Sequence, residues 1–144
     1  MISIIVPIRN EKKFIGSCLD SIIKQSVNEQ AEILISDGMS TDGTREIIKK
    51  YQKNNSSIHI LDNPEKIVST GFNRALSIAR GKVIIRVDGH AIVKSNYIDQ
   101  CLKVLKKTNA DCVGGPILNS SDGIIGKSIN IAQKLKFGVG GVAF

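Results

Sequence analysis

Short apolar runs rich in β-branched residues alternate along the chain with segments whose apolar residues recur at helical spacing. Each run ends at polar or turn-forming residues, as buried parallel strands commonly do. The expected strands are residues 2–8, 31–36, 58–61, 82–87 and 111–118. The expected helices are residues 14–23, 45–53, 68–80 and a segment that begins after residue 95, and residues 124–137 could form one more. This alternation predicts an α/β fold with a mostly parallel sheet and helices on both faces.

Individual residues predict where the helices begin and which side they bury. Asn10 is a candidate N-cap of the first helix and Ser95 of the fourth, because their side chains can accept a backbone N–H. Gly81 follows the third helix, where a glycine often ends a helix in the left-handed conformation. Phe14 and Leu76 belong to the apolar stripes that are expected to face the sheet.

The composition narrows the class of protein. A chain of 144 residues fits one domain, and its formal charge of +7 comes from lysines spread over predicted helix surfaces. The chain has only four Phe and two Tyr, which gives little support for a base-stacking, nucleic-acid-binding surface. Of the three cysteines, Cys18 and Cys101 occupy apolar positions of helical patterns and are expected to be reduced core residues.

Three of the predicted strands end in polar clusters, at residues 9–11, 37–38 and 88–90. Ligands of open α/β sheets bind at the carboxyl ends of strands, so the clusters predict one binding site. Each cluster also has a simpler explanation. The first could begin a helix, the second and third could be turns beside glycine, and a lone His90 is more often structural than a ligand. Their occurrence at three strand ends favours the functional interpretation.

Asp88 favours a site for a metal–diphosphate complex over direct phosphate binding. A diphosphate carries several negative charges, so a carboxylate can lie beside it only where a cation bridges the two. The chain has no G-x-x-x-x-G-K-[ST] loop, no G-x-G-x-x-G after the first strand and no G-x-S-x-G elbow. These absences argue against an ATPase, a dinucleotide-dependent dehydrogenase and an α/β-hydrolase.

Together the motifs resemble those of family 2 glycosyltransferases, whose Rossmann-like fold is called GT-A. In that family the first strand ends in a pattern like V-P-x-x-N-E, which residues 6–11 match. The second ends in a pattern like D-G-S-x-D-G-T, which residues 37–44 match with Met39 inserted. A third motif, N-x-(G/A) followed by A-x-G, a strand and D-x-D, corresponds to residues 73–90, with His90 in place of the second Asp.

The resemblance implies roles for individual residues. The residues that it assigns to the donor nucleotide are Pro7, Arg9, Glu11, Asp37 and Asp88. Pro7 and Glu11 are expected to border the nucleoside, and Asp37 to accept a hydrogen bond from uracil. Asp88 and His90 are expected to face the ribose, the diphosphate and a divalent cation, Mn²⁺ or Mg²⁺. An imidazole ligand suits Mn²⁺ better than Mg²⁺.

The implied function is the transfer of a sugar, with inversion, from a nucleotide-diphosphate sugar to a saccharide or lipid-linked acceptor in bacterial polysaccharide synthesis. A UDP-sugar is the favoured donor. The sequences at residues 36–40 and 86–91 look most like enzymes of exopolysaccharide assembly of the succinoglycan type. Residues 1–118 are interpreted as the nucleotide-sugar-binding subdomain, and residues 119–144 as the incomplete start of an acceptor-side region. No general base is assigned, although Asp122 is a candidate.

Other interpretations stay open. The chain could bind a nucleotide-sugar without transferring it, or it could be a nucleotidyltransferase or a flavodoxin- or receiver-like domain. The last two are disfavoured, because the Gly-rich basic loop of the one and the acidic pair and lysine of the other are absent. A strand begins at Ile2 and no apolar run reaches about 18 residues, so neither a signal peptide nor a membrane span is expected. The expected location is the cytoplasm, with the inner face of the plasma membrane as a further hypothesis.

Overall fold

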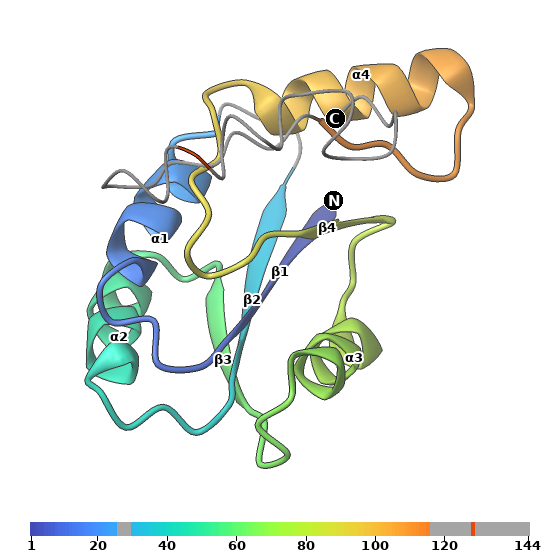
Figure 1. Ribbon diagram of the computed structural model, residues 1–144. Coiled ribbons are helices and arrows are strands. Elements are labelled where there is room, and N and C mark those ends of the chain that lie inside the picture. Colours follow the sequence, from blue (N-terminus) through green and yellow to red (C-terminus); the bar gives the residue numbers. More distant parts are fainter. Residues whose placement is uncertain (26–29, 116–127, 129–144) are drawn as a thin grey trace. The chain divides into compact units, whose positions relative to one another are not determined.

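The sheet predicted from the sequence is present and parallel. The computed structural model describes residues 1–25, 30–115 and 128, and the chain divides into two compact units, residues 1–100 and 101–144. Within the described residues of the first unit, four strands form one sheet in which all neighbours are parallel. They are β1 (Ile2–Ile8), β2 (Ala31–Asp37), β3 (Ile58–Asp62) and β4 (Val83–Arg86), in the order β3-β2-β1-β4 (Figure 1).

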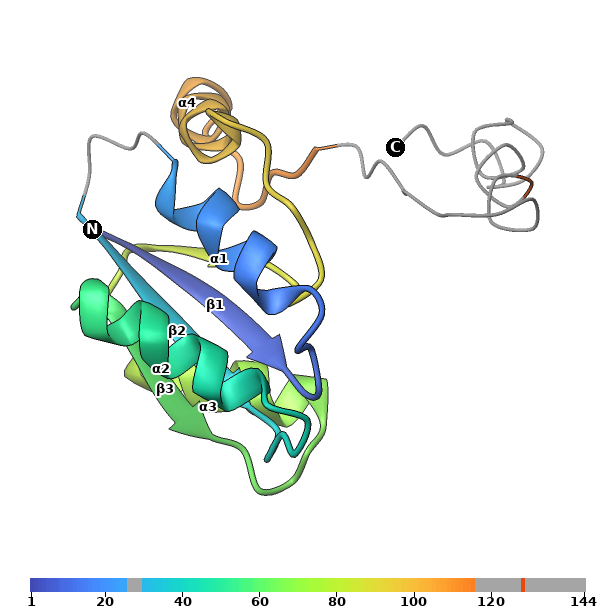
Figure 2. The same ribbon diagram turned by 90° about the vertical axis from the view of Figure 1, so that its left-hand side faces the viewer.

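Helices cover both faces of this sheet, as predicted. α1 (Ile15–Ile23) and α2 (Thr44–Asn54) pack together on one face, and α3 (Val68–Ile78) packs on β1 and β2 from the other (Figures 1 and 2). A further helix, α4 (Tyr97–Thr108), begins in the first unit and continues in the second. In the part of the chain that the structure describes, no helix is both long and apolar enough to cross a membrane.

β1 lies inside the sheet, and all seven of its residues are buried. Its sequence is apolar except for Ser3 because both faces of the strand are covered. Towards α3, Ile5 pairs directly with Leu34 of β2, and both pack with Ala75. Since parallel strands end at the same edge of a sheet, this core fixes the carboxyl ends of β1, β2 and β4 beside one another.

A buried carboxylate ties the connection between α3 and β4 to the amino-terminal edge of the sheet. Glu32 accepts hydrogen bonds from the Ser3 hydroxyl at 2.6 Å and from the Arg80 backbone N–H at 2.7 Å, and the Arg80 guanidinium lies 2.9 Å from its other oxygen. Burial alone raises the pKa of Glu32, but the bonds from Ser3 and Arg80 outweigh this effect. The pKa of Glu32 therefore lies below its usual value.

The prediction that Gly81 is a helix cap is wrong. α3 ends at Ile78, and Gly81 instead lies against the backbone of β1, where its N–H donates to the Ser3 hydroxyl at 2.8 Å. A Cβ on Gly81 would lie 2.4 Å from the backbone nitrogen of Ser3. Glycine is needed here because the strand approaches too closely for any side chain, not because of its backbone angles.

Both predicted N-caps are also wrong. α1 begins at Ile15 with Phe14 in the capping position, because Asn10 is used for a contact with another loop. α4 begins at Tyr97, so Ser95 is not in the capping position. Asn96 lies between Ser95 and the helix and has a left-handed φ of 64°.

Some predicted core residues are exposed. Phe14 is 51% exposed because it precedes the first turn of α1, and Leu76 is 42% exposed because α3 faces the sheet along Phe72 and Ala75 instead. Among the cysteines, which are all free, Cys18 is buried as predicted, whereas Cys101 is only half-buried.

The predicted fifth strand is not formed over residues 111–115, which contain no strand. Gly114 and Gly115 have low strand propensity, and most of this segment is exposed rather than buried. Residues 116–118 lie outside the described residues. Of the helix predicted at 124–137, only Ser128 is described, and it is helical.

Candidate functional site

The three polar clusters meet at the carboxyl edge of the sheet. One cluster follows β1, the second connects β2 with α2, and the third follows β4. The segment after β1 contacts both of the others. Asn10 bonds to the loop after β2, and Glu11 lies 2.9 Å from His90 after β4. The structure thus brings together residues that are separated by about 80 positions in the sequence.

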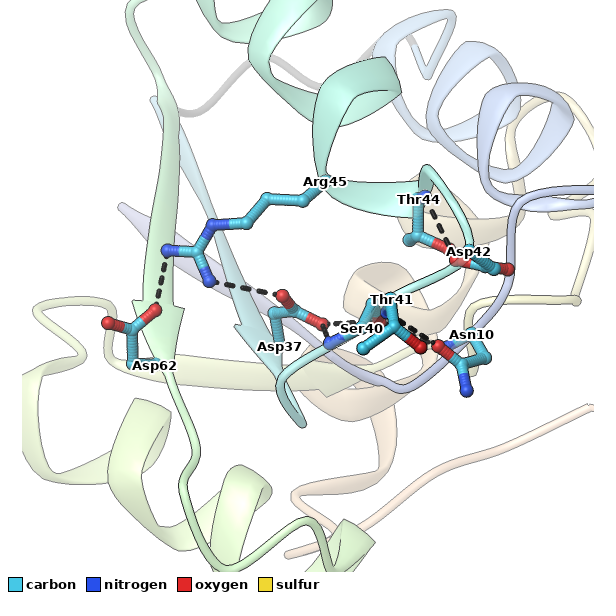
Figure 3. Close-up of polar contacts among 8 residues, drawn as sticks. All are labelled: Asn10, Asp37, Ser40, Thr41, Asp42, Thr44, Arg45 and Asp62. Atoms are coloured by element: carbon cyan, nitrogen blue, oxygen red, sulfur yellow. Dashed lines mark hydrogen bonds and ion pairs between the residues drawn. The ribbon is translucent and has the colours of Figure 1, made fainter.

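Asn10 joins the β1 and β2 loops through two hydrogen bonds. Its backbone N–H donates to the Ser40 hydroxyl at 2.8 Å, and its side-chain Oδ1 accepts from the Thr41 N–H at 2.9 Å (Figure 3). Its φ is 55°, a left-handed conformation that asparagine adopts more readily than most residues. The contact between the two loops therefore accounts for the choice of asparagine at position 10, through its side-chain acceptor and its left-handed backbone.

Asp37 is the last residue of β2, and its carboxylate is fully buried. Its Oδ1 accepts from the N–H and the hydroxyl of Ser40, at 3.1 and 2.6 Å. Its Oδ2 lies 3.1 Å from Arg45, which comes from the first turn of α2 and also lies 2.5 Å from Asp62 at the end of β3 (Figure 3). One guanidinium thus bridges the carboxylates of two neighbouring strands.

Asp42 fixes the start of α2. Its Oδ1 accepts from the Thr44 hydroxyl at 2.5 Å and from the Thr44 N–H at 3.0 Å, and its Oδ2 accepts from the N–H of Lys12 at 3.1 Å. The bond from the Thr44 hydroxyl is the main cause that lowers the pKa of Asp42. Gly43 permits the turn between them with a φ of 97°. The loop from Asp37 to α2 is therefore anchored to β2 and to the segment after β1.

Glu11 and His90 form a pair across the ends of β1 and β4. Nδ1 of His90 lies 2.9 Å from Oε1 of Glu11, and the two side chains are 62% and 19% exposed. Gly89 permits this approach, because a Cβ there would lie 2.5 Å from Ile8 and 3.2 Å from Glu11. A carboxylate at Nδ1 favours the tautomer with its proton on that nitrogen, which leaves Nε2 as an acceptor or metal ligand.

Asp88 is half-exposed, and Arg86 holds it from one side. Its Oδ1 accepts from Nε and Nη2 of Arg86, each at 3.1 Å.

Cys18 of α1 packs beneath this segment, and its thiol donates to the backbone carbonyl of Asp88 at 3.6 Å. Burial, followed by the charges of Glu11 and Asp88, raises the pKa of Cys18 to about 12. The thiol therefore stays protonated and acts as a packing residue rather than a nucleophile.

Pro7 and Arg9 lie on either side of the end of β1. Pro7 is buried inside the strand opposite Ser36, whereas Arg9 is exposed beyond it. The side chain of Arg9 lies over Gly38, where an added Cβ would be 3.1 Å from the Arg9 Cβ. Of the predicted donor-binding residues, Arg9, Glu11 and Asp88 are thus accessible in full or in part, while Pro7 and Asp37 are buried.

Three charged residues at this edge had no role in the sequence predictions: Arg45, Asp62 and Arg86. A signal for Arg86 was available, because it is the last residue of β4 and stands only two positions before Asp88. The bridge made by Arg45 depends on the register that pairs Asp37 with Asp62, and this pairing is a property of the assembled sheet.

The candidate metal ligands suit a cation that arrives with a nucleotide. Among the described residues, no three His, Cys, Asp or Glu side chains gather into a metal-binding group. Asp88 and His90 are 47% and 62% exposed, and each retains an atom that could bind a cation. Mg²⁺ is commonly held by one or two carboxylates together with substrate phosphates. The donor set therefore fits a cation shared with a diphosphate and not a preformed cage.

Comparisons of the whole sequence agree with the predicted family. A profile described as Glycosyl transferase family 2 matches residues 3–137. The succinoglycan biosynthesis protein ExoA of Rhizobium meliloti (strain 1021) is 31% identical over 140 residues, which cover 96% of this chain and 42% of that protein. Glycosyltransferase GlyG of Streptococcus pneumoniae serotype 4 is 33% identical over 126 residues, or 85% of this chain and 42% of the relative. The chain thus spans about two-fifths of the length of these relatives.

Solved structures show the same fold. S. aureus TarS matches with a TM-score of 0.69 and 23% identity over 81% of this chain and 38% of that one. TarS has also been solved in complex with UDP and with UDP-GlcNAc. The mannosyltransferase PcManGT from Pyrobaculum calidifontis, in complex with GDP-Man and Mn²⁺, matches with a TM-score of 0.67 and 25% identity over 72% of this chain and 32% of that one. These similarities confirm the predicted GT-A fold.

Proposed function

Because the chain belongs to glycosyl transferase family 2, we propose that it forms the donor-binding part of an inverting enzyme that transfers a sugar from a UDP-sugar. The acceptor is a saccharide or a lipid-linked saccharide of bacterial polysaccharide synthesis. Relatives named for succinoglycan biosynthesis and for glycosyl transfer support this assignment. The UDP and UDP-GlcNAc complexes of TarS support the choice of donor.

One observation carries the proposal: the segment after β1 is bonded to the loops after β2 and β4 at once. Asn10 holds the β2 loop through Ser40 and Thr41, and Glu11 holds His90. Loops at the carboxyl edge of a parallel sheet are where ligands of such folds bind. A nucleotide placed across this edge would meet groups from three strands in a fixed arrangement.

The nucleoside part of the donor is assigned to the ends of β1 and β2. Pro7 forms the floor inside β1, Arg9 and Glu11 border the ribose and base, and Asp37 accepts a hydrogen bond from the uracil. Arg9 is exposed beside Gly38 and can reach a ligand without rearrangement of the strand. This division leaves the end of β4 for the diphosphate.

Asp88 and His90 would hold a divalent cation together with the diphosphate. Glu11 orients His90 through Nδ1, so that Nε2 is presented as the ligand atom, in the manner of a carboxylate that supports a metal-bound histidine. When bound, the cation would neutralise negative charge on the departing diphosphate. The Mn²⁺ complex of PcManGT, which has a similar fold, supports the proposal of a divalent cation.

In the proposed transfer, an acceptor hydroxyl attacks C1 of the sugar from the face opposite the diphosphate. The C1–O bond to the diphosphate breaks, C1 is inverted, and a carboxylate takes the hydroxyl proton. No described residue is assigned as this base, and Asp122 lies outside the described residues. The proposed location is the cytoplasm at the inner face of the plasma membrane, where the net charge of +7 would favour anionic lipid.

The binding step is tested by calorimetric titration of the purified chain with UDP, GDP and ADP, each with and without Mn²⁺. We expect UDP to bind most tightly, Mn²⁺ to strengthen its binding, and Asp88→Ala to remove the effect of Mn²⁺. A folded chain that binds none of the three nucleotides would contradict the proposed function.

A further inference from the structure

Arg86 and Asp88 form an ion pair at the end of β4 that is open to solvent. Arg86 is the last residue of β4, and the two side chains are 55% and 47% exposed. Glu11, which follows β1 at the same edge of the sheet, contacts His90 two positions beyond Asp88. The pair therefore lies in the part of the edge that the proposed function assigns to the diphosphate.

The guanidinium holds Asp88 with a geometry that a phosphate could improve. Nε and Nη2 of Arg86 both donate to Oδ1, each at 3.1 Å. One oxygen thus shares two donors, and both bonds are longer than the roughly 2.7–2.9 Å common between a charged N–H and a carboxylate. In the parallel fork that guanidinium groups favour, each N–H meets an oxygen of its own. Two oxygens of a phosphate group offer this arrangement.

Arg86 can leave Asp88 at little cost, whereas Arg45 cannot leave Asp37. The Asp37 side chain is fully buried, so without Arg45 an unpaired charge would remain inside the protein. Asp88 is half-exposed, and water can take the place of the guanidinium. An exposed ion pair of this kind corresponds to at most about a fivefold change in an equilibrium constant.

A diphosphate at this edge needs positive charge from the chain itself. It carries several negative charges, and the carboxylates of Glu11 and Asp88 border its assigned place. A guanidinium stays charged throughout the physiological pH range, and its fork fits phosphate oxygens. If Arg86 turned to the diphosphate, Oδ1 of Asp88 would be released as well, so both carboxylate oxygens could face the cation.

We propose that Arg86 is a diphosphate-binding residue that rests on Asp88 in the free chain and turns to the diphosphate when the donor binds. The inference rests on the proposed function, because it adds a residue to the same donor site. Arg86 takes no part in the transfer of the sugar itself. Its two positions link the arrival of the nucleotide to the release of the Asp88 carboxylate.

A double-mutant cycle in metal-free buffer tests this exchange. UDP is titrated into the wild-type chain, Arg86→Gln, Asp88→Asn and the double variant, with EDTA present. Arg86→Gln should weaken UDP binding roughly tenfold, because a charged hydrogen bond is lost. Asp88→Asn should strengthen binding, since it removes both the repulsion of the diphosphate and the competition for Arg86.

The sign of the coupling separates exchange from a simple effect of charge. With Gln at position 86, Asp88→Asn removes only the repulsion, so its gain in UDP affinity should be smaller by up to about fivefold. If Arg86 stayed on Asp88 in the complex, it would shield that repulsion, and the gain would be equal or smaller in the chain that keeps Arg86. Contributions of independent charges would add.

Two further measurements accompany the cycle. Lys94→Gln is the matched control, because it removes the same charge from an exposed position on the segment after β4, and its effect should add to that of Asp88→Asn. In the ¹⁵N-labelled wild-type chain, the side-chain Nε–H signal of Arg86 should shift when UDP is added without a cation. Far-UV circular dichroism and thermal unfolding confirm that each variant is folded.

Each result has a distinct meaning. A larger gain from Asp88→Asn in the presence of Arg86, together with the Nε–H shift, supports the inference. An equal or smaller gain, or an Nε–H signal that UDP leaves unchanged, overturns it. UDP binding that occurs only with Mn²⁺ also overturns it, while the proposed function stands. A wild-type chain that binds UDP under neither condition overturns both.

Discussion

The backbone N–H of Thr41 donates to the side-chain Oδ1 of Asn10 at 2.9 Å, although the two residues are 31 positions apart. The contact joins the loop after β1 to the loop after β2, and the bond from the Asn10 N–H to Ser40 makes it reciprocal. Glu11 is the next residue and contacts His90 after β4. Asn10 and Glu11 therefore link the loop after β2 to the loop after β4.

Replacement of Asn10 should loosen the β2 loop and weaken UDP binding. Asn10→Ala loses the acceptor and also places alanine, which tolerates a left-handed backbone less well than asparagine, at a φ of 55°, so we expect a loss of about 1–2 kcal/mol in the free energy of unfolding. Asn10→Gly tolerates the backbone angle and separates the two effects. It should be more stable than Asn10→Ala in urea denaturation, yet bind UDP as weakly. Equal UDP affinity in Asn10→Gly and the wild type would show that the bond to Thr41 does not matter for the site.

Gly81→Ala should destabilise the fold, because the new Cβ would lie 2.4 Å from the Ser3 nitrogen and 2.5 Å from the Ile2 carbonyl carbon. Both contacts are with backbone, which cannot move aside, so a loss of roughly 1–3 kcal/mol or more is expected. Gly114→Ala is the matched control, since a Cβ there would meet nothing within 4 Å. Thermal unfolding of the two variants should differ clearly. Similar unfolding temperatures would contradict the close approach of Gly81 to β1.

Glu32 should make stability depend on pH. Its pKa is lowered in the folded state, so its contribution is fully present above its unfolded pKa, and it is lost as the pH falls through the lower folded pKa. Glu32→Gln should cost about 1–3 kcal/mol near pH 7, because Arg80 loses a charged partner. Urea denaturation of both proteins from pH 7 down to about pH 3 should show the gap narrowing below about pH 4. A gap that is constant over this range would argue against an ionised Glu32 in the folded chain.

His90→Asp should change the preferred cation. The substitution replaces an imidazole, which suits Mn²⁺, with a carboxylate, which suits Mg²⁺. We expect UDP titrations of the variant to show a smaller ratio of Mn²⁺-supported to Mg²⁺-supported affinity than the wild type. Glu11→Gln is a useful companion, because it keeps the shape of the partner of His90 but weakens its hold on Nδ1. If both variants keep the wild-type ratio, His90 is not a ligand of the cation.

The order of strands and helices was readable from the sequence because each run had a strong and simple pattern. β1 is the clearest example, since its run of mostly β-branched apolar residues predicted an interior parallel strand, and all seven residues are buried. The polar residues at the strand ends were found in the same way, because they interrupt apolar runs. Their convergence then follows from parallel pairing and was correctly expected.

Three of the errors and omissions came from contacts between residues far apart in the sequence. Asn10 is an ordinary N-cap by local preference, yet its side chain is bound by a loop that begins some 30 residues later. Gly81 resembles a helix terminator, but β1 determines its role. Arg45 was given no role from the sequence, because its ion pairs depend on the register that brings Asp37 and Asp62 together. Local propensity holds no information on such partners, which exist only once the sheet has formed.

Whether the ends of β1, β2 and β4 form one donor site is tested by a ¹⁵N-labelled NMR titration of the chain with UDP and Mg²⁺. We expect the backbone amide signals of residues 9–12, 37–44 and 87–91 to shift together with a single dissociation constant. Those of Ser3, Glu32 and Gly81, at the opposite edge of the sheet, should stay unchanged. Shifts confined to that opposite edge, or different constants for the three segments, would contradict it.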